Sequence, residues 1–370
     1  MTAKRSKPAA AVLAGFVALA GFAAVASSAT GDPRVVARVL SYNVHNLFDD
    51  IDDGGEYAAF RSDAGWSRED YYRRLDRLDE AIRLVSRGRR VDIVTLQEVE
   101  SARVAADFAR DFLRGFRYIS AGPSGVSNTK VVVLSRRRPA RVRAHRVAEV
   151  LLVPGLGGAA ISAGRPGRDA VDVTFSSPDL RLISVHWKSQ VGGEALTEPQ
   201  RILEAALVHD VLADDAGRSG GFARDAERLA TILVGDLNAD LDQYRRSGRA
   251  WPAAIMRVED VAEAERRFGR LRPGIRFACA ATPASPDALV FRSLWEGVSD
   301  EGTYLFRGEW SRLDQAFLHA PDSYAGALEV GSHPTLTARD GGPFGFSPRT
   351  GAGYSDHFAI LVTLTRARAR

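Results

Sequence analysis

Residues 231–238 read Thr-Ile-Leu-Val-Gly-Asp-Leu-Asn, an apolar run that ends abruptly in an acid and an amide. A short apolar run bounded in this way is typical of a buried β-strand. The same arrangement recurs along the chain, because one predicted strand after another is flanked by a side chain that can bind a metal ion or move a proton. Since the strands of a sheet bring their ends to a common rim, we expect one constellation of acids, amides and histidines. The flanking groups are Ser41-Tyr42-Asn43, Gln97-Glu98, His186-Trp187-Lys188, Asp236-Leu237-Asn238, Asp314 and Ser355-Asp356-His357.

Helical patterns lie between these strands. Residues 67–87 are predicted as a helix, because Ser67 and Asp70 resemble a capping box and apolar residues recur at intervals of four and three. Residues 198–213 are predicted as another helix, with Thr197 as its N-cap.

A hairpin pattern is also present. Residues 171–175 and 180–186 read as two strands that turn back on each other at Ser177-Pro178-Asp179. Helices interleaved with strands, together with a hairpin, favour a mixed-sheet α/β protein over a purely parallel one.

The flanking residues suit phosphoryl transfer. A phosphodiester is anionic and repels a nucleophile, so its hydrolysis needs a hard cation held by carboxylate and amide oxygens. Glu98, Asp356 and Asn43 are candidate ligands for Mg²⁺, with Mn²⁺ or Ca²⁺ as alternatives. The reaction also needs a base for water and donors for the developing charge. Candidates for these tasks are Asp236, Asn238, His186 and His357.

Five of these segments resemble, in order, the successive motifs of the endonuclease/exonuclease/phosphatase superfamily. Each motif alone is short, but their common order makes the resemblance specific, and it extends over residues 35–365. It implies a four-layer α/β/β/α sandwich with two packed mixed β-sheets, in one domain spanning residues 34–367. The segments are Ser41-Tyr42-Asn43-Val44, Leu96-Gln97-Glu98-Val99, Gly235-Asp236-Leu237-Asn238, Arg312-Leu313-Asp314-Gln315 and Ser355-Asp356-His357.

The resemblance also implies a metal site and a base. Glu98 is then the main metal ligand, with Asn43 beside it and Asp356 as a second acidic group near the metal. Asp236 orients or deprotonates the attacking water.

The remaining roles that the resemblance implies concern the phosphate. Asn238 holds it, and His357 binds one of its oxygens while Asp314 fixes the histidine ring. His186 occupies the position of a second histidine of pancreatic-type deoxyribonucleases, where it is a candidate proton donor to the leaving oxygen. Lys188 and Arg201 are cations predicted near the site that could bind substrate.

The sequence departs from the abasic-site repair branch of this superfamily. His45 stands where that branch carries an aspartate, and His186-Trp187-Lys188 replaces its tyrosine-rich motif. The chain looks closer to an exported bacterial branch of nuclease-like proteins, with residues 43–49 and 302–304 carrying that likeness.

The N-terminus reads as an export signal. Lys4, Arg5 and Lys7 precede an apolar run over residues 9–26 that ends in small residues, which is typical of a cleaved signal peptide. We therefore expect residues 1–29 to be removed and the protein to be periplasmic or secreted. An uncleaved membrane anchor is the alternative.

Composition bears on nucleic-acid binding and on the use of cysteine. Without the three basic residues of the export signal, the formal net charge falls from +4 to +1, so overall basicity gives no support for nucleic-acid binding. The single cysteine, Cys279, excludes an internal disulfide and a cysteine-based zinc site.

Three functions remain open from the sequence. A nuclease acting on DNA is the leading interpretation, and we expect it to act as a monomer without an obligate protein partner. A phosphodiesterase or phosphatase on a small or lipid phosphoester is the second, for which the apolar loop at residues 151–161 is a candidate membrane contact. A non-catalytic scaffold is the third, and the joint presence of the predicted catalytic residues opposes it.

Overall fold

The computed structural model describes residues 34–123, 127–146, 152–154, 160–162, 168–218, 229–271, 274–278 and 290–367. The predicted signal peptide and Cys279 lie outside these residues. Of the apolar loop at residues 151–161, only β6 (Leu152–Pro154) and part of β7 (Ala160–Ser162) are described, without their side chains. Within the described part of the chain, no helix combines the length and apolar character needed to cross a membrane.

The first of two large sheets has six strands. Their order across the sheet is β17 (Tyr324–Val330), β18 (Ile360–Arg366), β1 (Arg34–Leu47), β2 (Ile93–Val99), β4 (Lys130–Ser135) and β3 (Tyr118–Ala121). The β1–β2 pair is parallel, whereas β18 and β4 run antiparallel to their neighbours. The sheet is therefore mixed, as predicted.

The second sheet has eight strands and is also mixed. Strands β9 and β10 are parallel, and β16 is antiparallel to β10. The predicted hairpin is confirmed as the antiparallel pair of β8 and β9. The order is β11 (Ile255–Arg257), β12 (Ile275–Ala278), β13 (Val290–Ser293), β16 (Asp314–His319), β10 (Ala230–Asp236), β9 (Asp179–His186), β8 (Ala170–Ser176) and β5 (Arg141–His145).

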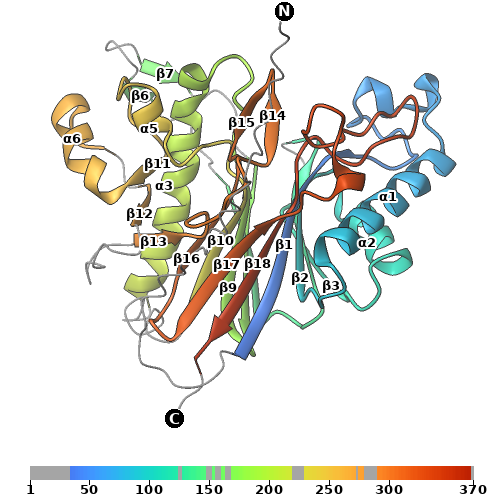
Figure 1. Cartoon of the computed structure of the whole chain (residues 1–370), viewed down its shortest axis with the longest axis horizontal. Helices are drawn as coiled ribbons and strands as arrows, with labels where there is room; N and C mark the ends of the chain where they lie inside the picture. The colour runs from blue at the N-terminus through green and yellow to red at the C-terminus, as the bar shows by residue number, and fades with distance from the viewer. Residues whose placement is uncertain are drawn as a thin grey trace, which may run out of the picture.

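Helices cover the outer faces of the two sheets. Figure 1 shows α1 (Arg68–Ser86) and α2 (Ala102–Asp111) outside the six-stranded sheet, and α3 (Glu194–Arg218) and α6 (Val258–Phe268) on the opposite side of the molecule. The predicted α/β/β/α sandwich is confirmed. The smaller elements are η1 (Ala58–Phe60), η2 (Ser62–Ala64), α5 (Gln243–Arg246), the β14 (Tyr304–Phe306) and β15 (Glu309–Ser311) hairpin, and η3 (Pro334–Leu336).

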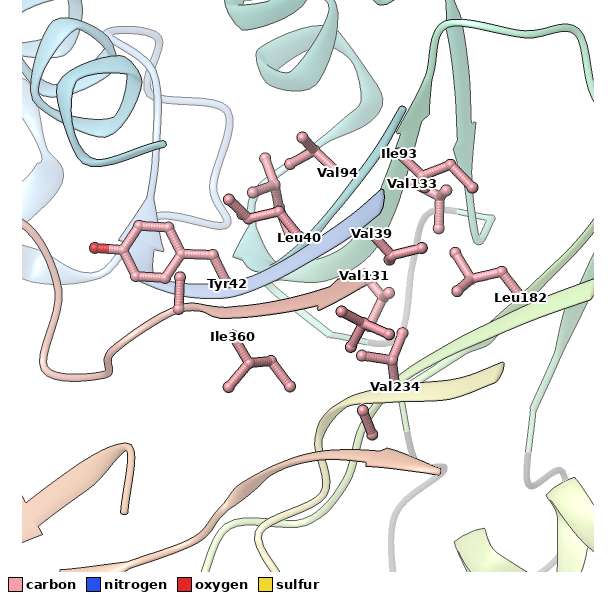
Figure 2. Close-up of a cluster of buried hydrophobic side chains, with 14 of the residues drawn as sticks. Val39, Leu40, Tyr42, Ile93, Val94, Val131, Val133, Leu182, Val234 and Ile360 are labelled. Atoms are coloured by element: carbon pink, nitrogen blue, oxygen red, sulfur yellow. The ribbon is translucent and has the colours of Figure 1, made fainter. Parts of the chain in front are cut away.

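The core lies between the sheets and under the helices. Val39 and Leu40 point to opposite faces of β1, yet both are completely buried, which explains the uninterrupted apolar sequence of that strand. Figure 2 shows side chains of the first sheet, such as Val39 and Val131, facing Leu182 and Val234 of the second. The buried apolar surface between the sheets is what fixes them against each other.

Local sequence explains where α1 begins. Ser67 accepts a hydrogen bond from the backbone of Asp70, and the Asp70 side chain accepts from the backbone of Ser67, so the predicted capping box is confirmed. The helix ends at Arg87, which adopts a left-handed conformation with a φ of +50°.

The start of α3 differs from the prediction. The helix begins at Glu194, and Thr197 lies inside its first turn, where its hydroxyl donates to the carbonyl of Gly193 over 2.8 Å. Thr197 is therefore not the N-cap. Pro199, which lacks an N–H group, marks an early position of a helix, and the first residue of the extra turn is held from elsewhere in the chain, since Arg246 donates to Glu194 over 2.7 Å.

The topology brings the chemically useful strand ends together. Because β1 and β2 are parallel, as are β9 and β10, their carboxyl ends lie at one rim of the sandwich. Strands β16 and β18 run the other way and so begin at that rim. Gly235 allows β9 and β10 to approach closely there, since its φ is +144° and a Cβ atom would clash with the carbonyl of Val185.

Candidate active site

Three strands of the second sheet place their polar residues side by side at the rim. Asp236 at the end of β10 is paired in register with His186 at the end of β9 and with Asp314 at the start of β16. Residues paired directly across neighbouring strands point to the same face of a sheet. The expected convergence of these three side chains therefore follows from strand register.

Asn43 connects this group to the first sheet. Its side-chain Nδ2 donates to Asp236 Oδ2 over 2.9 Å and to Glu98 Oε1 over 3.3 Å. Its Oδ1 accepts from the backbone N–H of His45 over 3.0 Å. In this arrangement Asn43 orients two carboxylates, one from each sheet. The predicted role as a metal ligand would need Oδ1, which is already engaged, to face the ion as well.

Glu98 presents its carboxylate at the open side of the group. Its Oε2 accepts from the backbone of Asn46 over 2.9 Å, which holds the side chain in place. The side chain keeps about a fifth of its surface exposed, at 19%. Glu98, Asn46 and His45 all adopt positive φ values, of +66°, +62° and +51°. Left-handed conformations are uncommon for residues other than glycine, although asparagine and histidine adopt them more readily than most, and they cluster at functional sites.

The donor set fits a small hard cation. Mg²⁺ retains several waters and binds proteins through one or two carboxylates. Among the described residues, Glu98 and Asp356 are not part of any group of three acidic or histidine side chains whose ligand atoms lie within 4.8 Å. A site with Glu98 as its anchor therefore suits Mg²⁺ better than a cation that needs a full protein cage. Such an ion would supply Lewis acidity at a phosphate oxygen.

Asp314 and His357 form a buried pair. The distance from His357 Nδ1 to Asp314 Oδ2 is 2.7 Å, and both residues are almost completely buried. Burial alone would lower the pKa of His357, but the charge and hydrogen bond of Asp314, together with Asp236 and Asp356, raise it well above its usual value. His357 therefore carries a positive charge at neutral pH, and its Nε2 is the nitrogen left for a phosphate oxygen.

Asp236 has the properties of a base for water. Burial and the neighbouring Asp314 raise its pKa to about 7, against the opposing effects of His357 and of hydrogen bonds from Asn43 and Asn238. A base is most effective when its pKa lies near the working pH. Asn238 donates its backbone N–H to Asp236 Oδ1 over 3.0 Å, which fixes the orientation of the carboxylate.

His186 lies beside these carboxylates in a different protonation state. Its Nε2 is 3.4 Å from Asp236 Oδ2 and 3.8 Å from Glu98 Oε1. Burial, with the positive charges of Arg168 and His357, lowers its pKa well below the usual value. A neutral His186 does not carry the extra proton of a general acid, whereas His357 does. This protonation state does not support the predicted role of His186 as proton donor to the leaving oxygen, and that role stays a prediction.

The segment after β9, which contains Trp187 and Lys188, is held by hydrogen bonds between its backbone and side chains of neighbouring elements. The side chain of Asn238 donates to the carbonyl of Trp187 over 3.2 Å, and Gln190 donates to the carbonyl of Asn238 over 3.0 Å. The backbone N–H of Lys188 donates to Glu204 over 2.8 Å. The Lys188 side chain is exposed, as its predicted contact with substrate requires.

The structure does not place Arg201 where a substrate could reach it. Arg201 is fully buried in α3, and its guanidinium pairs with Glu198 at 2.7 Å. It also donates to the carbonyl of Lys188 over 3.0 Å, to the Thr197 hydroxyl and to the carbonyl of Glu194. The prediction of a substrate contact is corrected accordingly: Arg201 supports the backbone of Lys188 from below.

Asp356 lies at the outer side of the rim. Its carboxylate is 3.8 Å from His45 Nδ1 and is partly exposed, so it remains available to an ion or to solvent. The preceding Ser355 is buried and donates to the backbone carbonyl of Asn43 over 2.6 Å, while its hydroxyl accepts from the backbone of His357. Ser355 therefore positions His357 against β1.

The sequence motifs include Ser355 and Tyr304 without indicating a role for either in the site, and sequence reasoning misses Glu204 altogether. The ring of Tyr304 lies 4.9 Å from that of His357, and the two residues form an isolated β-bridge. The position of Ser355 in its motif indicates this support, because a hydroxyl two residues before a histidine can accept the backbone N–H of that histidine. No comparable local pattern points to Glu204, whose partner is 16 residues away.

Comparisons with known proteins agree with this architecture. A profile of the Endonuclease/Exonuclease/phosphatase family matches residues 40–357. The comparison with curated protein sequences gives no significant match.

Two solved structures illustrate the likeness in fold, and a third matches with a lower TM-score. An endonuclease/exonuclease/phosphatase family protein from Bacteroides thetaiotaomicron is 15% identical, with 90% of this chain and 98% of that chain covered and a TM-score of 0.51. A functionally unknown conserved protein from Enterococcus faecalis is 12% identical, with 89% and 99% covered and a TM-score of 0.50. TDP2 from Caenorhabditis elegans is 15% identical, with 90% and 75% covered and a TM-score of 0.47.

The Asp314–His357 pair generates a double-mutant prediction. Asp314→Ala and His357→Ala should each lower kcat by about 10²-fold, because each removes the charged imidazole from its working orientation. The double variant should lose little more than the worse single variant. Asp322→Ala, which removes an exposed carboxylate, serves as the control. Losses that multiply in the double variant would show that the two residues act independently.

The burial of Arg201 generates a stability prediction. Arg201→Met should lower the free energy of unfolding by about 3–5 kcal/mol, because it leaves the buried Glu198 carboxylate without its cationic partner, with only the donors of Gln243 and Ala254 remaining. Urea titration measures this loss. Lys188→Met, which removes an exposed cation, should change KM with little effect on unfolding. If Arg201→Met raised KM and left the unfolding curve unchanged, Arg201 would be a substrate contact after all.

Proposed function

The chain belongs to the endonuclease/exonuclease/phosphatase family of metal-dependent phosphoesterases, and from this premise we propose that it is an exported nuclease that hydrolyses DNA. Export rests on the N-terminal sequence, in which a basic stretch precedes an apolar run and small residues. An exported nuclease would meet extracellular DNA as its accessible polymer.

The observation that carries the DNA proposal is an aromatic edge beside His357. Tyr304 stacks nearly parallel to Phe306, with an interplanar angle of 14° and ring centroids 6.4 Å apart. Phe306 is 56% exposed, and the guanidinium of Arg307 lies 5.1 Å from the centre of its ring. In Figure 1 the β14–β15 hairpin that carries these residues projects beyond the ends of the sheets. Aromatic rings with an adjacent arginine are the groups on which nucleobases stack.

The proposed reaction divides the work among the residues of the rim. Asp236 accepts the proton of the attacking water, and Asn238 holds the Asp236 carboxylate in position and contributes to phosphate binding. His357, charged by its pairing with Asp314, donates a hydrogen bond to a phosphate oxygen. Glu98 would hold the metal ion, and the Tyr304 and Phe306 rings would support the bases next to the scissile phosphate. The attack is in line with the departing oxygen, whose bond to phosphorus breaks as the new one forms, and the departing alkoxide takes up a proton from solvent water.

A second candidate is a phosphodiesterase or phosphatase that acts on a lipid. It is favoured by two apolar side chains near Lys188, since Val191 is 80% exposed and Leu196 is 72% exposed. Exposed apolar groups beside an active site are typical of enzymes that approach a membrane surface. If this candidate is right, activity should depend on Val191 and not on Phe306.

Parallel assays separate the two candidates. Plasmid DNA, a nitrophenyl phosphodiester and sphingomyelin vesicles are each incubated with Mg²⁺, Mn²⁺, Ca²⁺ or a chelator. We expect hydrolysis of DNA that the chelator abolishes and Mg²⁺ or Mn²⁺ restores. Undiminished activity in the chelator would contradict a metal-dependent mechanism.

Two surface variants sharpen the assay. Phe306→Ser should lower kcat/KM for DNA about tenfold more than for the nitrophenyl phosphodiester, because one base-stacking contact is worth about 1–3 kcal/mol. Val191→Ser is the matched control, and on the nuclease proposal it leaves DNA hydrolysis unchanged. Preferential hydrolysis of sphingomyelin that depends on Val191 and not on Phe306 would favour the lipid candidate.

A further inference from the structure

We propose that the loop after β1 binds a second divalent cation, of the Ca²⁺ class, between the carboxylates of Asp53, Glu56 and Glu100. This site is separate from the predicted catalytic metal at Glu98. It would join a surface loop to the end of β2, next to the rim that carries the catalytic residues.

The three carboxylates are already close enough to surround one ion. One oxygen from each lies within 4.8 Å of the other two. Ca²⁺ takes oxygen ligands at 2.3–2.6 Å, so ligands on opposite sides of the ion lie about 4.8 Å apart. Asp53 is exposed, Glu56 half-buried and Glu100 buried, which gives the ion a path from solvent to the deepest ligand.

Glu100 supplies the independent sign of a missing ligand. Only 7% of the residue is exposed. Its Oε2 accepts from the backbone N–H of Asp49 over 3.0 Å, whereas its Oε1 is buried and has no hydrogen-bond partner among the described residues. A buried carboxylate oxygen without a donor is unfavourable. A cation held with Asp53 and Glu56 would give that oxygen the partner it lacks.

Glu56 accepts from the backbone N–H groups of Asp53 and Gly54, which fixes its carboxylate and leaves a further lone pair on each oxygen for an ion. Asp49 also lies nearby, but it forms an ion pair with Arg103 and accepts from the backbone of Ile51. Two carboxylates from an irregular loop and one from the end of β2 suit Ca²⁺, which accepts six to eight oxygens in flexible geometry, better than Mg²⁺, which keeps most of its waters.

Different groups hold the carboxylates of the two proposed cation sites. The Glu98 carboxylate is held by Asn43 and by the backbone of Asn46. The Glu100 carboxylate is instead held by the backbone of Asp49, although Glu98 lies near the end of β2 and Glu100 directly follows that strand. Removing one site should therefore leave the other able to bind.

The loop contains built-in optical reporters. Trp66 donates its indole N–H to the carbonyl of Asp49 over 2.7 Å, and Tyr57 follows Glu56 directly in the sequence. Tb³⁺ occupies Ca²⁺ sites and emits when nearby aromatic rings transfer energy to it. Tb³⁺ bound at the proposed site should therefore emit on excitation of the protein, and added Ca²⁺ should displace it.

The test is a Tb³⁺ titration of the full mature chain in a Glu98→Gln background, which removes the predicted catalytic ligand. Emission should persist in this background and should fall at least about tenfold when Glu56→Gln or Glu100→Gln is added. Asp63→Asn removes the same charge from an exposed position in the following segment and should leave emission unchanged. Ca²⁺ should raise the Tm of Glu98→Gln, and that increase should disappear with Glu56→Gln.

The outcomes are decisive in both directions. Emission that is unchanged by Glu56→Gln would overturn the proposal, as would emission that Asp63→Asn removes equally. Absence of Ca²⁺-competable emission in Glu98→Gln would show that no second site exists. If Glu100→Gln fails to fold, the exposed-side variants Asp53→Asn and Glu56→Gln decide the matter alone.

Discussion

The amide of Asn43 joins the two sheets at the point where the chemistry is placed. One nitrogen atom donates to Glu98 of the first sheet and to Asp236 of the second. The backbone carbonyl of the same residue accepts from Ser355, whose hydroxyl also positions His357. The core between the sheets sets their separation, and Asn43 converts that separation into a fixed distance between two carboxylates. Glu98, Asp236 and, through Ser355, His357 are thereby tied to one residue of β1.

Packing also gives the two histidines at the rim different charges. His357 is buried beside Asp314 and is held in the charged state, which suits binding of a phosphate oxygen. His186 is equally buried, but the positive charges near it add to desolvation, and it is held neutral. Two residues of one type thus acquire different chemistry from their surroundings, because the charge and hydrogen bond of Asp314 outweigh burial at His357, whereas burial and nearby positive charges dominate at His186.

Local patterns account for what the sequence predicts well. The capping box of α1 and the hairpin of β8 and β9 are confirmed because each depends on residues close together in the chain. The motifs at the strand ends converge because their order matches the topology of the family. The sequence does not show which polar side chains are buried or how they are oriented. Arg201 reads as a cation near a phosphate, yet α3 encloses it with Glu198. The amide orientation of Asn43 is equally invisible, because it depends on Asp236, 193 residues away.

The central claim is that both sheets together build one metal-dependent catalytic centre with Glu98 as its anchor. The most direct measurement is Mn²⁺ binding, followed by electron paramagnetic resonance, in a Glu56→Gln background that removes the proposed loop site. The account predicts one site whose affinity falls by at least about tenfold when Glu98→Gln is introduced, with a parallel loss of phosphodiester hydrolysis. Mn²⁺ affinity that is the same with and without the Glu98 carboxylate would contradict it.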